Sequence, residues 1–159
     1  MIRLRLENES AFYNSLDPTR VRIDNNVYDY LKSFCYEIEK RPQLFDTIQI
    51  LCSGPYDTEK AKLALVDAVD REQKKLDQKI RKNRKRILDN YLTGIILSIL
   101  GFVLAKLLDA VFLETISFLG TIAVKDALKI QTKANPDLEQ LKRNVEPFRN
   151  IKLEVVRDE

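Results

Sequence analysis

The chain has 159 residues, of which 45% are apolar and 32% charged, and its formal net charge is +3. This length suits one modest domain, or a small domain with a membrane element. The absence of histidine removes the commonest general base and metal ligand. Cys35 and Cys52 lack the spacing of a zinc site or of a disulfide framework. We therefore expect no catalytic residues, no metal and no cofactor, and a protein that is not an enzyme.

The N-terminal residues 1–56 predict part of a small α+β domain. Ile2–Glu7 alternates apolar and charged residues, which indicates a half-buried strand. Val27–Lys40 has one apolar helical face, and Thr47–Cys52 is a short apolar strand. Residues 8–26 are polar and long for a connection in a small domain, a length typical of functional or flexible loops. The predicted contacts of this loop with a partner or ligand are made by Phe12, Tyr13, Asp17 and Arg20.

Residues 57–87 are predicted to form a basic stalk helix. No glycine or proline interrupts the chain over residues 60–93, so the helix should continue into the apolar region that follows. Its exposed part allows ion pairs at i,i+4, such as Asp67–Arg71 and Asp70–Lys74. No aromatic residue interleaves the basic run, which favours headgroup contact and topology anchoring over nucleic-acid binding. The anchoring residues are Lys79, Arg81, Lys82, Arg84, Lys85 and Arg86.

The next region, residues 88–133, is predicted to be a transmembrane helical hairpin. From Tyr91 to Val124 the only charged residues are Lys106, Asp109 and Glu114. A single span would place these charges near the bilayer centre, where each Lys or Asp costs roughly 2.5–3.5 kcal/mol. If the chain reverses around them, the charges lie at the far interface instead. Two short spans result, and a soluble oligomer that buries the apolar helices is the alternative.

Flanking charges predict the orientation of the hairpin. Basic residues precede the first span and follow the second, whereas the connection between the spans carries one Lys against Asp109 and Glu114. The positive-inside rule therefore places both termini in the cytoplasm and the turn outside the cell membrane, which is the inner membrane in a two-membrane cell. Residues 1–10 lack the apolar core of a signal peptide, so we expect the internal segment to direct insertion.

Small residues recur along both spans at helical spacing. Stripes of this kind allow close approach of helix backbones in a membrane. Two interpretations remain open: the stripe packs the hairpin on itself, or part of it contacts neighbouring subunits in a homo-oligomer. The residues concerned are Gly94, Ser98, Gly101, Ala105, Ser117 and Gly120.

Residues 134–159 are predicted to return to the cytosolic domain. Pro136 should open a short helix, and Ile151–Val156 alternates as a second half-buried strand. We expect this strand to lie beside Ile2–Glu7 in one sheet. The predicted fold class is thus α+β with a membrane element: a cytosolic domain of residues 1–56 and 134–159, the stalk helix, and the hairpin.

Two functions agree with these features. The first is a membrane effector that self-associates and perturbs or permeates the bilayer under control of its cytosolic domain. Small two-span toxic effectors of bacterial defence have this general build, although no motif ties the sequence to a family. The second is a non-catalytic membrane-anchored adaptor that holds a partner at the cytoplasmic face. The expected partners are the lipid bilayer, further copies of the chain, and an unidentified cytosolic partner or ligand, but not nucleic acid.

Overall fold

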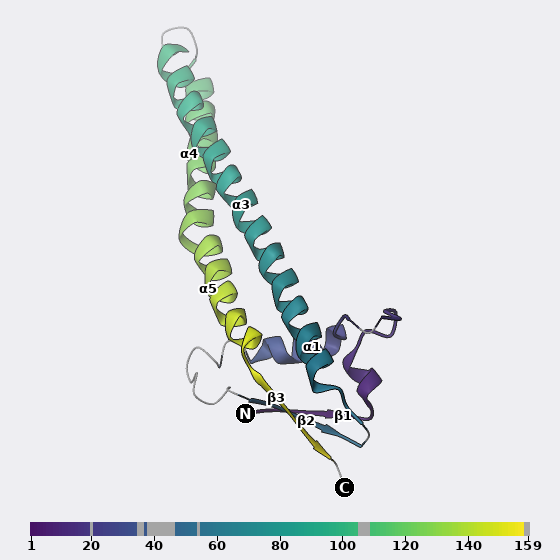
Figure 1. Cartoon of the computed structure of the whole chain (residues 1–159). Helices are drawn as coiled ribbons and strands as arrows, with labels where there is room; N and C mark the ends of the chain where they lie inside the picture. Colours follow the sequence, from purple (N-terminus) through teal and green to yellow (C-terminus); the bar gives the residue numbers. More distant parts are fainter. Residues whose placement is uncertain (20, 35–36, 38–46, 54, 105–108, 158–159) are drawn as a thin grey trace. The chain divides into compact units, whose positions relative to one another are not determined.

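The computed structural model describes all residues except 20, 35–36, 38–46, 54, 105–108 and 158–159. The chain divides into two compact units, which we call unit 1 (Met1–Lys75 and Leu141–Glu159) and unit 2 (Leu76–Gln140). Helices, a small parallel sheet and one long apolar helix make up the fold (Figure 1). The general prediction of a mixed helix and strand protein with a long apolar helix is confirmed.

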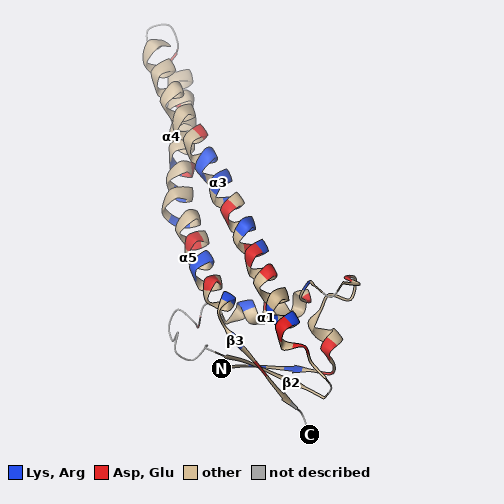
Figure 2. Cartoon of the chain, in the orientation of Figure 1, with Lys and Arg blue, Asp and Glu red and all other residues tan. Residues whose placement is uncertain are grey.

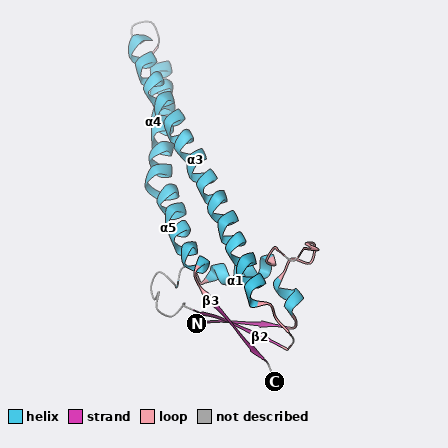
Figure 3. Cartoon of the chain, viewed as in Figure 1, coloured by secondary structure: helices cyan, strands magenta, loops and turns pink. Residues whose placement is uncertain are grey.

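The sheet of unit 1 has the order β1 (Ile2–Leu6), β2 (Thr47–Cys52), β3 (Lys152–Arg157), with all strands parallel (Figure 3). Both terminal strands belong to it, as predicted. Our expectation that they are neighbours is wrong, because β2 pairs with both. The reason is burial: β2 is the most apolar of the three strands, and its Ile48 and Ile50 are fully buried. In the interior position β2 has the backbone hydrogen-bonding groups of both its edges paired, and the more highly charged strands β1 and β3 lie at the edges of the sheet.

One face of the sheet forms the core of unit 1. Along β1 the side chains alternate between buried and exposed, as the sequence pattern predicts. The buried side chains belong to one core together with those of α1 (Asn25–Ser33) and the first part of α3 (Thr58–Leu104). The contribution of α3 consists of Ala61, Ala64, Leu65, Ala68 and Val69. The predicted stalk therefore begins as a core helix of unit 1.

Capping residues account for where the helices of unit 1 begin. The Asp24 carboxylate accepts a hydrogen bond from the backbone N–H of Asn26 at 2.8 Å, so α1 begins two residues before the predicted Val27. The regular helix ends at Ser33, and the rest of the predicted helix, including Cys35, lies largely outside the described residues. The Asp57 carboxylate caps α3 through the N–H of Lys60 at 3.0 Å.

The C-terminal segment is tied to α3 by polar contacts within unit 1. It consists of the end of α5 (Asn135–Val145), the 3₁₀ turn η4 (Glu146–Arg149) and β3. Arg149 pairs with Asp70, so this carboxylate joins two segments instead of pairing with Lys74 as predicted. The predicted pair Asp67–Arg71 is confirmed, with an N–O distance of 2.8 Å.

Unit 2 contains the second part of α3, α4 (Ala110–Lys129), the π-helical turn η3 (Ile130–Ala134) and the start of α5. The helix α3 is continuous over 47 residues, as its lack of internal glycine and proline before Gly94 predicts. Its contacts with the returning chain are antiparallel. Asn83 is hydrogen-bonded to Asn135 at 3.0 Å, and Tyr91 to Gln131 at 3.0 Å.

Candidate functional site

The most conspicuous feature of unit 2 is a continuous apolar surface on α3 and α4. Figure 2 shows that charged residues gather on the earlier turns of α3. From Asn90 to Leu104 the helix carries no charged residue. Large apolar side chains on both helices are 42–86% exposed. They are Leu88, Leu92, Ile95, Ile96, Ile99, Leu100, Phe102, Val103, Val111, Phe112, Phe118, Leu119, Ile122 and Leu128. A surface of this extent marks contact with a membrane or another protein.

Among the described residues, α3 is the one helix that is long and apolar enough to cross a membrane. Only 6% of its most apolar 18-residue window is buried, so this part is not a core helix of the monomer. The second helix, α4, carries four charged residues within its 20 residues: Glu114, Lys125, Asp126 and Lys129. Its uncharged stretches are correspondingly shorter, and the prediction of a second span stays a prediction.

Several hydroxyl groups on these helices donate a hydrogen bond to a carbonyl of their own helix. The Ser98 hydroxyl donates to the carbonyl oxygen of Gly94 at 2.8 Å. Thr115 and Thr121 donate in the same way to the carbonyls four residues earlier, at 2.9 Å each. Such bonds let Ser and Thr side chains enter an environment without water, because no donor is left unsatisfied.

The small residues of the predicted stripe differ in what they contact. A Cβ on Gly94 would lie 2.6 Å from Cγ2 of Val124 and 3.3 Å from the carbonyl oxygen of Gly120, so the absence of a side chain at Gly94 permits close approach of α4. A Cβ on Gly101 would make only an ordinary contact, at 3.6 Å from Cγ2 of Ile116. Gly94 and Gly120 thus lie where α3 and α4 approach each other closely. Ser98 and Ser117 are exposed, and Ala105 lies outside the described residues.

The charged residues selected from the sequence are exposed wherever they are described. The side chain of Asp109 precedes α4 without capping it, and Glu114 lies one turn into that helix. Lys106 lies outside the described residues. All members of the basic run are exposed: Lys79, Arg81, Lys82, Arg84, Lys85 and Arg86.

The polar segment 8–26 of unit 1 is more ordered than a loop. It contains the 3₁₀ helix η1 (Glu9–Phe12) and an antiparallel bridge between Tyr13 and Ile23. Phe12 and Tyr13 are 1% and 3% exposed and belong to the core. Their assignment as partner contacts is corrected, because burial in the core accounts for them. Arg20 lies outside the described residues.

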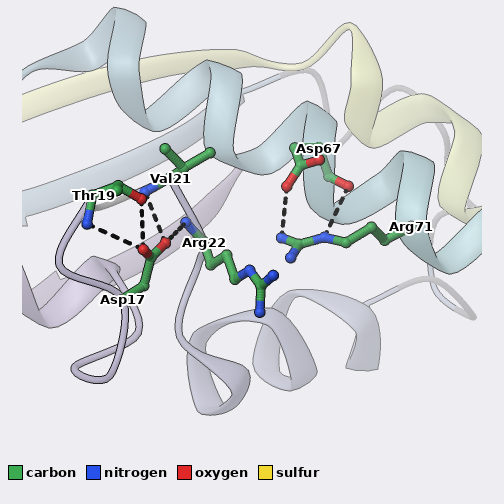
Figure 4. A network of polar contacts seen from close by, with 6 residues as sticks. All are labelled: Asp17, Thr19, Val21, Arg22, Asp67 and Arg71. Carbon is green, nitrogen blue, oxygen red and sulfur yellow. Dashed lines mark hydrogen bonds and ion pairs between the residues drawn. The ribbon is translucent and has the colours of Figure 1, made fainter.

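Asp17 organises the turn of this segment rather than presenting its carboxylate to a partner (Figure 4). The carboxylate accepts hydrogen bonds from the Thr19 hydroxyl at 2.5 Å and from the backbone N–H groups of Val21 and Arg22 at 3.1 and 2.8 Å. These bonds, above all the one from Thr19, lower the pKa of Asp17 from 3.8 to about 2. The ionised carboxylate therefore fixes the backbone that carries Arg22.

The turn should loosen in acid. The pKa of Asp17 is lower in the folded protein than in the unfolded chain. The stability that its carboxylate gives the turn is therefore complete above about pH 4 and is lost as the pH falls towards 2. We expect the Asp17 carboxyl and the amides of Val21 and Arg22 to titrate together in NMR spectra, with a midpoint near 2. In Asp17→Asn the titration of both amides should disappear. A midpoint near 4 would show that the hydrogen bonds are not formed in solution.

Beside this turn lies a hollow that the sequence did not predict, lined by Arg22 from the segment 8–26 and by Arg71 from α3. The turn-forming and basic residues of 14–26 could have indicated a site on this segment. The contribution of α3 to the hollow arises only when the chain folds. Within the described residues no group of three or more Cys, Asp or Glu side chains could hold a metal ion.

Comparison of the chain with protein-family models, with curated proteins and with solved structures finds no match.

Proposed function

We propose that the chain is a small membrane protein whose helices α3 and α4 insert as a two-helix hairpin, self-associate, and perturb or permeate the bilayer. The observation that carries this proposal is the exposed apolar surface around both helices of unit 2. In water that surface would drive aggregation, whereas in lipid it needs no further cover. Unit 1 is the cytosolic domain that controls the hairpin, and no catalysis is involved.

The distribution of charge supports one orientation in the cell membrane. The exposed basic residues 79–86 and Lys125, Lys129 and Lys133 flank the apolar parts of α3 and α4 on the side of unit 2 where Asn83 meets Asn135. Asp109 and Glu114 lie at the other ends of these parts. By the positive-inside rule, both termini are cytoplasmic and the connection is external.

Cysteine labelling in intact cells and in inverted vesicles tests this topology. We expect Ala110→Cys to react with an impermeant maleimide from outside, and Lys82→Cys and Lys133→Cys to react only from the cytoplasmic side. The wild-type Cys35 and Cys52 are first replaced by serine and alanine, respectively. Labelling of positions 82 and 133 from opposite sides would establish a single span and reject the hairpin.

Self-association would use the part of the small-residue stripe that α3–α4 packing leaves accessible. Gly101 has room for a Cβ next to α4, and Ser98 and Ser117 are exposed. A leucine at Gly101 would exceed the space beside Ile116 of α4 and reshape the surface of the hairpin, so we expect it to disturb contacts between copies before it disturbs insertion. Glu114, an exposed carboxylate on α4, would line a wet path or meet a basic group in the assembly.

Dye release from liposomes, with crosslinking of the same samples, tests the effector function. We expect wild type to form crosslinked oligomers and to release dye. Gly101→Leu should insert but lose the oligomer and the release, and Glu114→Gln should keep the oligomer and change the release. If wild type inserts without any release, and both variants behave like it, the protein is the membrane-anchored adaptor instead. If alkaline carbonate extracts the wild type, the soluble oligomer holds.

A further inference from the structure

Unit 1 has a hollow of about 490 Å³ between the segment 14–29 and α3. Its lining includes Asn14, Arg22 and Tyr28 on one side, and Arg71 and Lys75 on the other. The volume lies in the range of small-molecule sites, which is roughly 300–1,000 Å³. Every lining residue belongs to unit 1, so the site is complete within one compact unit.

The charge of the lining is predominantly positive. Four cationic side chains line the hollow against two acidic ones, Asp29 and Glu72. The Glu72 carboxylate is already neutralised by Lys32, with an N–O distance of 2.5 Å. Neither Arg22 nor Lys75 forms an ion pair with a side chain in the described part of the chain. Once Lys32 and Glu72 cancel, Arg22, Arg71 and Lys75 stand against Asp29 alone, so the lining keeps a net positive charge for an incoming anion.

Arg71 adds a third donor group. Its ion pair with Asp67, at 2.8 Å, uses one terminal nitrogen, and its Nε donates to the Asp67 carbonyl at 3.4 Å. A guanidinium has five N–H donors in one plane, so Arg71 keeps donors for a ligand while Asp67 holds it in place. Figure 4 shows Arg22 on the turn fixed by Asp17, and Arg71 on α3.

Arg22 and Arg71 also line a second hollow, of about 440 Å³, together with Asp17 and Asp67. The two hollows thus share the two arginines. Because Asp17 holds the N–H of Arg22 at 2.8 Å, the turn determines where the Arg22 side chain begins. Asp17 and Asp67 are positioning residues here, one for each arginine.

We propose that this hollow binds a phosphorylated small molecule, with its phosphoryl group held by Arg22, Arg71 and Lys75. Two planar guanidinium groups and one ammonium match the geometry and charge of a phosphate. The hollow is larger than a phosphate ion, and Tyr28 with the Asn14 and Asn25 amides offers a ring face and hydrogen bonds to an organic part. This site does not depend on the membrane function proposed above, although its ligand would suit the control of a hairpin.

Calorimetry on the full chain in detergent tests the site with defined probes. These are pyrophosphate, ADP and glucose 6-phosphate, with adenosine and glucose as counterparts without phosphate. We expect at least one phosphorylated probe to bind saturably and its counterpart not to bind. Arg22→Gln and Lys75→Gln should each weaken binding about tenfold or more. Lys74→Gln, an exposed neighbour outside the hollow, should bind like wild type.

Circular dichroism melting curves keep this test independent of folding, because both Arg22 and Lys75 are exposed and their variants should melt like wild type. If no phosphorylated probe binds better than its counterpart, or if Lys74→Gln and Lys75→Gln weaken binding equally, the proposal is wrong. Dihexanoyl phosphatidic acid forms a further arm. Saturable binding of this lipid without binding of the soluble probes assigns the phosphate to a lipid headgroup and overturns the small-molecule ligand. None of these outcomes depends on dye release.

Discussion

Replacing Gly94 by leucine is expected to separate α3 from α4. Already the Cβ would lie 2.6 Å from Cγ2 of Val124, a distance that side chains do not adopt, and 3.3 Å from the carbonyl oxygen of Gly120. The valine is β-branched and stiff, and the carbonyl belongs to a helix backbone, so neither can yield without moving α4. Forcing a larger side chain into such a contact costs roughly 1–3 kcal/mol.

Alanine substitutions at the three glycines are expected to change the stability of the α3–α4 packing in opposite directions. A helical Gly→Ala change gains about 0.5–1 kcal/mol where the Cβ has room. Gly101→Ala and Gly120→Ala meet this condition, because their nearest neighbours would lie at 3.6 and 3.5 Å. Both should stabilise the packed helices, whereas Gly94→Ala should destabilise them.

The readout is a short bismaleimide that bridges Asn83→Cys and Asn135→Cys, placed where these two side chains are hydrogen-bonded at 3.0 Å. Crosslinking should be efficient in wild type and in the alanine variants at 101 and 120, reduced in Gly94→Ala, and lost in Gly94→Leu. Equal crosslinking of Gly94→Leu and wild type would contradict the close approach of the two helices.

Local patterns in the sequence were sufficient to find the elements but not their order in space. Alternation over residues 2–6 and 152–156 predicts strands because it reports which side chains lie on one face. It carries no information about neighbours, so the interposition of β2 between the terminal strands could not be read from it. A central strand has the backbone N–H and C=O groups of both its edges paired. Which strand takes that position therefore depends on all the strands of the sheet together.

The loop residues were misread for a related reason. Phe12 and Tyr13 lie among polar residues in the sequence, although both are buried in the fold. Composition alone does not distinguish an aromatic residue of the core from one on a binding surface. Arg22 was overlooked because its significance comes from Arg71, 49 positions away, on a helix whose sequence pattern predicts only a stalk. The Gly94–Gly120 contact, in contrast, agrees with the spacing of small residues, which encodes where backbones meet.

The largest expected effect on localisation comes from a charge in the middle of the apolar surface. Ile96 on α3 is 55% exposed, and Ile96→Lys would place an ammonium among apolar neighbours. If lipid surrounds this surface, the substitution costs roughly 3–4 kcal/mol, the sum of a central lysine and the lost isoleucine. That cost shifts the ratio of inserted to uninserted chain by roughly two to three orders of magnitude. We expect the variant to leave the carbonate-resistant membrane fraction almost entirely.

Leu63→Lys is the matched control, because Leu63 lies on the same helix and is 70% exposed, but belongs to unit 1. An exposed apolar side chain in water can be replaced by lysine within about 0.5 kcal/mol. The two substitutions are therefore nearly equivalent in water and differ by several kcal/mol if only the second part of α3 lies in lipid. If the Leu63→Lys protein stays in the membrane fraction and the Ile96→Lys protein leaves it, water surrounds Leu63 and lipid surrounds Ile96. Identical fractionation of both variants would mean that water or protein, not lipid, surrounds Ile96.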